Sequence, residues 1–274
     1  MAASTPVPDE PARETTELEQ QCERLRSLHV PGDPLVLPNA WDAATARAVA
    51  TAGFPAVATT SGGVAAPLGH EDHEGAPASE MLAAAGRIIR AVDLPVTVDA
   101  EAGYGMEAGD LVAVLREVGA AGCNLEDTDH RAEELRNAAE QAEWLRAVRE
   151  AASEKGYGLV INARIDTYLA PLLSGSEIAQ GELTDDALRR AHVYVEAGAD
   201  SVYPIALWEP DALRRFVAES PAPVNVLRTP RVPSLPELAE LGVARISWGG
   251  LLEHDAATRF TEVLSGIAAE ARAT

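Results

Sequence analysis

Short apolar segments alternate with longer amphipathic segments along most of this chain. From Leu35 onward, each apolar run is followed by a turn rich in Gly, Asp and Asn, and then by a stretch with helical periodicity. The runs that we expect to form strands are 35–37, 56–60, 96–99, 123–126, 158–163, 201–203, 224–227 and 245–247. The stretches that we expect to form helices lie near 42–52, 79–92, 107–120, 134–155, 184–197, 209–219, 234–241 and 252–271, and another is expected at 15–28.

Eight strand–helix units in this order predict a TIM barrel, the (β/α)8 fold. Segments such as AGFPAVATT and LGVARISWGG repeat the transition from helix through glycine to strand, and no boundary interrupts them. We therefore expect one barrel domain over residues 14–274, preceded by a tail at 1–13. A doubly wound sheet is the alternative, but the chain has neither a G-x-G-x-x-G nor a G-x-x-x-x-G-K-[ST] loop.

The composition of the chain limits the kinds of molecule that it is expected to bind. The chain has 274 residues and a net charge of −21, which argues against binding to nucleic acid or to an anionic membrane. No apolar run is long enough to span a bilayer. The two cysteines form no redox or metal pair, and the N-terminus lacks a signal-peptide pattern. A cytoplasmic protein is the default expectation.

The segment 96–105, VTVDAEAGYG, contains the strongest chemical signal. Asp99 and Glu101 follow a β-branched run and are two residues apart, so both carboxylates should leave the strand end on one side. Two such acids repel each other unless a cation or a proton lies between them. Because the nearby donors are oxygens, Mg2+ is the preferred ion, with Mn2+ as an alternative. An acidic surface turn is the simpler interpretation.

In a TIM barrel the catalytic residues lie at the carboxyl-terminal ends of the strands. This rule places several acids and Arg164 at a common mouth, and it adds Trp41 and Asn225 as candidates for substrate binding. The polar and glycine residues expected there are Asn39, Trp41, Asp42, Thr60, Ser61, Gly62, Gly63, Asp99, Glu101, Glu126, Asp127, Asn162, Arg164, Asp166, Tyr203, Asn225, Arg228 and Ser247.

Five segments resemble motifs of the isocitrate lyase/phosphoenolpyruvate mutase superfamily, in the same order. They are ATTSGG, LGHED, VDAEAGYG, GCNLED and NARIDTYL. The resemblance implies a Mg2+ site at Asp99, Glu101 and Glu126, and a substrate-binding role for Arg164. It further places Ser61, Gly62 and Gly63 on the turn that grips a 2-oxo acid, and Asp72 on an aspartate of the superfamily's L-G-x-x-D motif.

The chemistry implied by the resemblance is formation of an enolate. A 2-oxo carboxylate chelates the metal, Arg164 pairs with its carboxylate, and backbone N–H groups at 61–63 hold negative charge. The leading hypothesis is a lyase that cleaves a C–C bond in a small 2-oxo or 2-hydroxy (di)carboxylate. The alternatives are P–C bond chemistry, an oxaloacetate decarboxylase or hydrolase, and a non-catalytic barrel that binds 2-oxo acids. The resemblance also implies a swapped C-terminal helix and a homo-oligomer, a dimer or a tetramer.

The loop after the fourth strand departs from the lyase pattern. Lyases of the superfamily carry K-K-C-G-H there, whereas this chain has DTDHRAEELRNAAEQ at 127–141, without a cysteine. Cys123 lies inside a predicted strand, where packing is its expected role. His130 is then the candidate general acid or base, with a solvent-facing histidine as the alternative. A zinc site at 70–74, HEDHE, is disfavoured because its spacing is not H-E-x-x-H.

Overall fold

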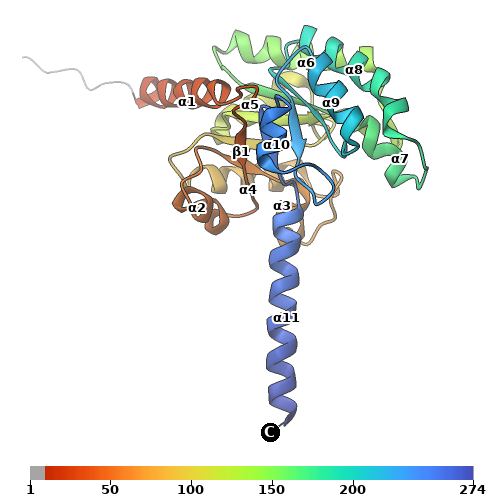
Figure 1. Cartoon of the computed structure of the whole chain (residues 1–274). Helices are drawn as coiled ribbons and strands as arrows, with labels where there is room; N and C mark the ends of the chain where they lie inside the picture. Colours follow the sequence, from red (N-terminus) through yellow and green to blue (C-terminus); the bar gives the residue numbers. More distant parts are fainter. Residues whose placement is uncertain (1–9, 274) are drawn as a thin grey trace, which may run out of the picture.

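Parallel strands form the centre of the molecule and helices surround them (Figure 1). The computed structural model describes residues 10–273, with side chains from residue 17 onward. One sheet has the order β2-β3-β4-β5-β8-β9 and another has the order β1-β11-β10. The strands are β1 (Leu35–Leu37), β2 (Asn39–Ala40), β3 (Val57–Thr59), β4 (Val96–Asp99), β5 (Gly122–Glu126), β8 (Val160–Ile165), β9 (Ser201–Pro204), β10 (Asn225–Leu227) and β11 (Arg245–Ser247).

Two links join these sheets into a ring. Pro38, which has no N–H group to donate, separates β1, which is the first predicted strand and pairs with β11, from β2, which was not predicted and pairs with β3. On the other side, the Val202 N–H donates to the carbonyl of Pro223 at 3.0 Å, and Val202 bridges Val224 in parallel. The neighbour order is that of a TIM barrel, as the sequence predicts.

Helices follow the strands as expected, with local differences. They are α2 (Ala43–Thr51), α3 (Ser61–Leu68), α4 (Ala78–Ile89), α5 (Ala108–Val118), α6 (Ala138–Glu154), the 3-10 helix η1 (Asp166–Tyr168), α7 (Leu169–Leu173), α8 (Gln180–Glu196), α9 (Pro210–Glu219) and α10 (Leu235–Glu240). The sequence did not predict α3 or α7. The helix expected from 134 begins at Ala138, because β6 (Thr128–Asp129) and β7 (Glu134–Leu135) form a hairpin before it. The Asn137 side chain then caps α6.

An N-terminal helix, α1 (Glu10–Ser27), packs against the amino-terminal ends of the strands. Cys22 and Leu25 are fully buried on it. A Cβ at Gly122 would lie 2.8 Å from Leu25 Cδ2, so glycine permits this close approach. The predicted tail at 1–13 falls largely on residues 1–9, which lie outside the described residues, and α1 begins within the remainder of that range.

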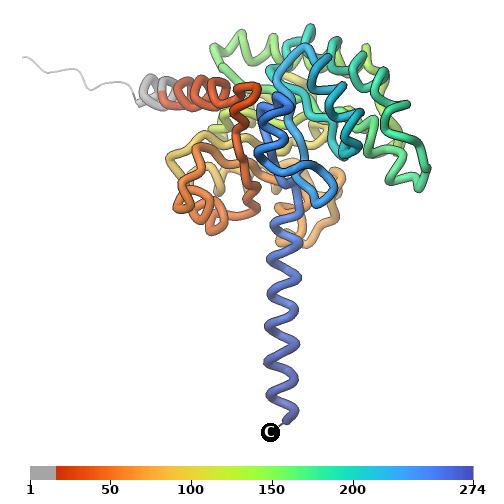
Figure 2. Tube along the Cα trace, viewed as in Figure 1, coloured from red at the N-terminus to blue at the C-terminus, as the bar shows by residue number. Residues whose placement is uncertain are grey.

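The last helix, α11 (Leu251–Ala273), extends away from the barrel as a single long rod (Figures 1 and 2). None of its described residues is buried, and four large apolar side chains are exposed at Phe260, Val263, Leu264 and Ile267. Their spacing places them on one face of the helix. None of the helices within residues 10–273 is both long and apolar enough to cross a membrane.

Candidate functional site

The candidate residues meet at the carboxyl-terminal ends of β3, β4, β5 and β8, which are consecutive neighbours in the sheet. Asp99 ends β4 and Glu126 ends β5, and the register of β5 with β8 sets Glu126 opposite Arg164. Parallel pairing therefore brings together residues that are far apart in the sequence. Their carboxylates fall into two clusters, which differ in whether a cation accompanies them.

The unpaired cluster consists of Asp72, Asp99 and Glu101. Asp99 Oδ2 accepts a hydrogen bond from the Ser61 N–H at 3.0 Å, but Asp99 Oδ1 is buried with no partner among the described residues. Asp72 Oδ1 is likewise buried and unpartnered there. Such oxygens lose their hydration without compensation, which is costly unless another group binds them.

Glu101 has the most perturbed carboxylate of this cluster. It is 3% exposed, and burial raises its pKa to about 8. A hydrogen bond from the Glu74 N–H opposes that rise, whereas the negative charges of Asp99, Asp72 and Glu126 add to it. Glu101 is therefore a carboxylate that favours either a proton or a nearby cation.

The backbone around this cluster is strained. Four residues have φ values in the left-handed region that non-glycine residues rarely adopt. The values are 48° at Glu101, 58° at Tyr104, 65° at His73 and 58° at Glu74. The Glu74 carboxylate accepts a hydrogen bond from the Tyr104 N–H at 2.5 Å and so holds the two loops together. Strain of this kind concentrates at functional sites, where the surrounding structure compensates for it.

The segment 61–63 is the first turn of α3 rather than an open loop. The first hydrogen bond within α3 runs from the Val64 N–H to the Thr60 carbonyl. The N–H groups of residues 61–63 come before it and therefore have no partner within the helix. A Cβ at Gly62 would lie 2.8 Å from Asp72 Oδ2, so glycine lets that carboxylate approach the helix N-terminus. At Gly63 a Cβ would lie 2.7 Å from Thr60 Cγ2. The Ser61 amide already binds Asp99, and the amides of 62 and 63 remain at the helix N-terminus to attract an anion.

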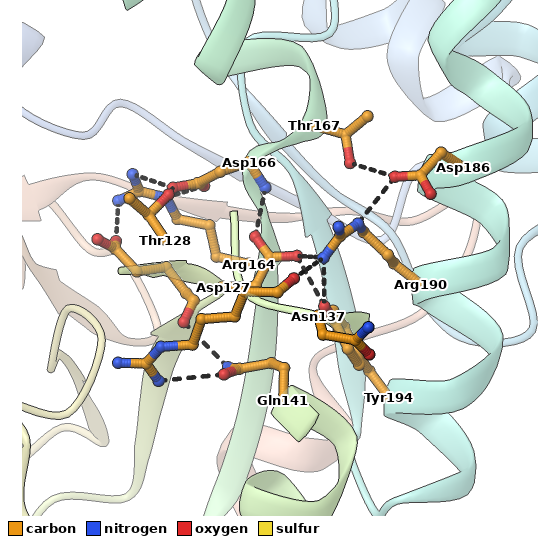
Figure 3. Close-up of polar contacts among 12 residues, drawn as sticks. Asp127, Thr128, Asn137, Gln141, Arg164, Asp166, Thr167, Asp186, Arg190 and Tyr194 are labelled. Atoms are coloured by element: carbon orange, nitrogen blue, oxygen red, sulfur yellow. Dashed lines mark hydrogen bonds and ion pairs between the residues drawn. The ribbon is translucent and has the colours of Figure 1, made fainter. Parts of the chain in front are cut away.

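The paired cluster consists of Glu126, Asp127 and Asp166, together with Arg164 and Arg190. Figure 3 shows the last four of these residues. Arg164 is 8% exposed, and its Nε and Nη2 donate to Asp166 Oδ1 and Oδ2 at 2.7 and 3.1 Å. Its Nη1 forms an ion pair with Glu126. A guanidinium has five N–H donors. Two of them make the hydrogen bonds to Asp166 and one faces Glu126 in the ion pair, so two have no partner among the described residues and could bind a substrate carboxylate.

A second layer fixes the position of Arg164. The Asp166 N–H donates to Asp127 Oδ1 at 2.8 Å, while Asp127 Oδ2 accepts from Arg190 Nη1 at 2.9 Å and from the Tyr194 hydroxyl at 2.7 Å (Figure 3). Burial raises the pKa of Asp127 to about 6, although Arg190 opposes the rise. Asp127 therefore positions the backbone of Asp166, which in turn holds Arg164.

His130 lies where the two clusters meet. Its Nε2 contacts Glu126 Oε1, and its ring centroid is 5.2 Å from that of His73. Burial opposes ionisation of His130, but the hydrogen bond and charge of Glu126 outweigh it and raise the pKa. Burial also raises the pKa of Glu126 to about 7, against the influence of Arg164. The pair can hold or transfer one proton at the imidazole Nε2.

The structure does not bring every predicted residue to these carboxylates. Asn225 is fully buried and bonds to the Ser247 hydroxyl on the neighbouring strand at 3.3 Å. Trp41 is half-buried, with its Cβ 3.2 Å from the position of a Cβ at Gly63. Among the side chains that the structure describes, from residue 17 onward, no three of His, Cys, Asp or Glu converge closely enough to hold a metal ion directly. The zinc alternative at 70–74 therefore gains no support.

The unpaired cluster nevertheless fits a hydrated Mg2+. This ion usually keeps several waters and takes only one or two carboxylates directly, so it does not need three converging protein ligands. The two orphaned oxygens of Asp72 and Asp99 are available to such an ion or its waters, and the raised pKa of Glu101 suits either a proton or a nearby cation. Asp99 would hold the ion, and Asp72, Glu101 and Glu126 would orient its waters.

Comparison with known proteins places the chain in a family. Residues 25–268 match the family model described as phosphoenolpyruvate phosphomutase. The chain belongs to this family. Among relatives in it, an uncharacterised Mycobacterium tuberculosis protein is 36% identical over 227 residues, which cover 83% of this chain and 82% of the relative.

Two further phosphoenolpyruvate phosphomutase-family relatives differ in the reaction their names give. The 2-methylisocitrate lyase of Salmonella typhimurium is 32% identical over 223 residues, covering 73% of this chain and 71% of that protein. A Burkholderia cenocepacia protein of solved structure, named provisionally as a phosphonomutase, is 42% identical with a TM-score of 0.83. That match covers 90% of this chain and 99% of the other. Membership is clear, and the reaction varies among relatives.

Several residues of the site had no role in the sequence-based prediction. Asp166 and Asp127 were expected at strand ends, but not as the partners of Arg164 and Arg190. Glu74 was considered only for zinc, whereas its backbone and side chain bind the Glu101 loop. An arginine on a helical face such as Arg190 gives no sequence signal of its own. The acidic pair Glu126 and Asp127 at the end of β5 is the one signal in the sequence that indicates a buried cation must exist.

Proposed function

We propose that this protein is a Mg2+-dependent lyase that cleaves a C–C bond in a small 2-oxo or 2-hydroxy carboxylate through an enolate. The observation that carries the proposal is the division of the mouth into an unpaired acid cluster and a buried arginine with two free donors. The unpaired cluster suits a cation, and Arg164 in the paired cluster suits a substrate carboxylate. Membership of the phosphoenolpyruvate phosphomutase family supports the same chemistry.

In this proposal each residue has a separate task. Mg2+, when bound at Asp99, would supply Lewis-acid stabilisation of the developing enolate oxygen. Arg164 binds the substrate carboxylate end-on, while Asp166 and Glu126 keep its guanidinium plane fixed. The amides at the N-terminus of α3 attract the same negative charge. His130 accepts or returns a proton at its other ring nitrogen, Nδ1, while Glu126 holds Nε2 and stabilises the charged form.

Calorimetry with oxalate, an enolate mimic, tests the metal and arginine tasks together. We expect oxalate to bind when Mg2+ or Mn2+ is present and not in the presence of a chelator. Binding of equal strength without metal would rule out the chelate. A panel of 2-oxo acids, malates and phosphonates, with detection of released pyruvate, then identifies the reaction.

Cleavage of a P–C bond is the second candidate. The similarity to the Burkholderia cenocepacia protein favours it. The same panel separates the two once phosphate and phosphoenolpyruvate are also measured. Hydrolysis of phosphonopyruvate releases inorganic phosphate together with pyruvate, whereas a mutase converts it to phosphoenolpyruvate and releases neither. Turnover of phosphonopyruvate alone would replace the C–C lyase assignment.

We infer that a second copy of the chain covers the apolar face of α11. Phe260 is 63% exposed and Ile267 is 56% exposed, and a monomer rarely leaves such a face uncovered. Sedimentation velocity should show a dimer or a tetramer, and Leu264→Asp should shift it toward monomer. Thr258→Asp, on the opposite face of the same helix, serves as the control. A monomeric wild type would contradict the inference.

A further inference from the structure

A cavity of about 350 Å³ adjoins the carboxylate clusters. It lies between the β6–β7 hairpin, α7 and the loop that carries His73. Two of its lining residues contact the paired cluster. His130 contacts Glu126, and the Thr128 hydroxyl donates to Asp166 Oδ2 at 2.6 Å. A molecule whose carboxylate binds Arg164 can therefore extend past these two side chains into the cavity.

The wall of the cavity is largely apolar. Leu135, Ala170 and Leu173 contribute to it, and the Leu173 side chain is 65% exposed. An exposed leucine in a hollow beside a polar site is a feature of ligand pockets, which are mostly apolar with a few polar groups that fix orientation. The volume is at the lower end of the range for small-molecule pockets, about 300–1,000 Å³.

The charges at the rim oppose a second carboxylate. Glu133 and Glu134 line the cavity and are exposed, and no Lys or Arg is among the lining residues. The remaining ionisable groups are two imidazoles, of which His130 already faces Glu126. A carboxylate placed there would be desolvated against two negative charges, without a guanidinium to pair with it.

We propose that this cavity is a subsite for an uncharged alkyl or aryl substituent of the substrate. The protein would then act on 2-oxo or 2-hydroxy acids that carry such a group rather than on dicarboxylates. This inference rests on the proposed function, because it takes the acid end of the substrate to lie at Arg164. It adds the chemical class of the other end.

The test compares the affinities of three acids for the protein in saturating Mg2+. Oxalate reports on the acid site alone, 2-oxo-4-phenylbutanoate adds an apolar tail, and 2-oxoglutarate adds a charged one. We expect the wild type to bind the phenyl acid about tenfold more tightly than 2-oxoglutarate. Equal affinity, or preference for 2-oxoglutarate, would overturn the subsite.

Two variants locate the preference in the cavity. Ala170→Trp fills the cavity and Leu173→Glu adds charge to it, and each should weaken binding of the phenyl acid about tenfold while leaving the oxalate affinity unchanged. Leu172→Glu is the matched control, because Leu172 is exposed on the same helix and does not line the cavity. Equal losses in Leu172→Glu and Leu173→Glu would also overturn the subsite.

Oxalate separates the two levels of the proposal. If the wild type fails to bind oxalate with Mg2+, the proposed function fails and the subsite fails with it. If oxalate binds but the tail preference is absent, only the subsite fails. Unchanged oxalate affinity in each variant also shows that the variant is folded.

Discussion

Two aspartates at opposite ends of the barrel have opposite environments. Asp200, before β9, binds Arg26 Nε at 2.9 Å, Arg149 Nη2 at 2.6 Å and the Ile161 N–H at 2.8 Å. Asp99, at the end of β4, receives one backbone hydrogen bond on Oδ2 and leaves Oδ1 unpartnered among the described side chains. The same residue type is satisfied at the amino-terminal end and unsatisfied at the mouth.

The difference shows which carboxylates stabilise the fold and which do not. A buried carboxylate without a cation destabilises the folded state, so it persists only where it serves another purpose. In TIM barrels the amino-terminal face serves stability and the carboxyl-terminal face serves catalysis. Substitutions at the mouth should therefore change binding more than stability, and substitutions at the closed end should do the reverse.

The largest expected effect is that of Asp99→Ala on metal binding. We expect Mg2+-dependent binding of oxalate to be abolished, because the residue that holds the ion is lost. Stability without metal should not decrease, since an unpaired charge is removed. Calorimetry and urea unfolding measure the two effects.

Glu101→Asp is the matched control for Asp99→Ala. It shortens an acid of the same cluster by one methylene and keeps its charge, so oxalate binding should be retained or improved. If Asp99→Ala bound metal and oxalate as the wild type does, the ion would have to lie elsewhere.

His130→Ala should lower kcat by about 10²–10⁴, the usual contribution of a general acid or base. Metal and oxalate affinity should change little, because the imidazole transfers a proton rather than holding the ligand. Turnover of the substrate identified by the pyruvate panel measures the effect. Turnover equal to that of the wild type would leave Asp72 as the better candidate for proton transfer.

Arg164→Lys should weaken oxalate binding by about 2–4 kcal/mol. A lysine places one point charge where the guanidinium now reaches Asp166, Glu126 and the substrate at once. Calorimetry in saturating Mg2+ gives the loss, and Arg214→Lys at the surface is the control. Unchanged affinity would show that the substrate carboxylate binds elsewhere.

Asp200→Ala should destabilise the protein by about 3 kcal/mol, because two guanidiniums lose their shared partner. Oxalate affinity at the mouth should stay the same in the folded protein. Asp211→Ala is the control, since Asp211 pairs with Arg214 at an exposed site and such pairs contribute little. Loss of oxalate affinity in Asp200→Ala would show that the two ends are coupled.

The sequence predicts the barrel well because its signals are local. Apolar runs and Gly-rich turns recur in each unit, and the ends of neighbouring strands must then meet at one mouth. The helix α3 was missed because Ser61, Gly62 and Gly63 are typical of a turn. Asp99, on a distant strand, binds the Ser61 amide at the start of this helix, and the local pattern does not show that long-range contact.

The partners of the buried acids could not be predicted for the same reason. Arg190 lies on an amphipathic helix 63 residues from Asp127, and nothing in the local pattern distinguishes it from a surface arginine. His130 was a candidate with two open alternatives, and the β6–β7 hairpin is what turns it toward Glu126. Long-range contacts, rather than propensity, decide these positions.

The smallest expected effect concerns His29, near the closed end. Its Nδ1 donates to the Leu25 carbonyl at 2.8 Å, and burial, together with the charge of Arg245, lowers its pKa from 6.5 to about 4. The unfolded chain therefore binds a proton more readily than the folded one between these values, and stability must fall as the pH falls below 6.5. From about pH 7.5 to about pH 5 this histidine should remove about 2 kcal/mol.

Urea unfolding of the wild type and of His29→Phe at the two pH values isolates that contribution. The carboxylates of the mouth titrate in both proteins, so they cancel in the difference between the two pH dependences. We expect the wild type to lose about 2 kcal/mol more than His29→Phe on acidification, because phenylalanine cannot accept the proton. His192→Gln, at an exposed position, should behave as the wild type does. Identical pH dependence in wild type and His29→Phe would mean that His29 is not held neutral by burial, and that acid sensitivity resides at the mouth alone.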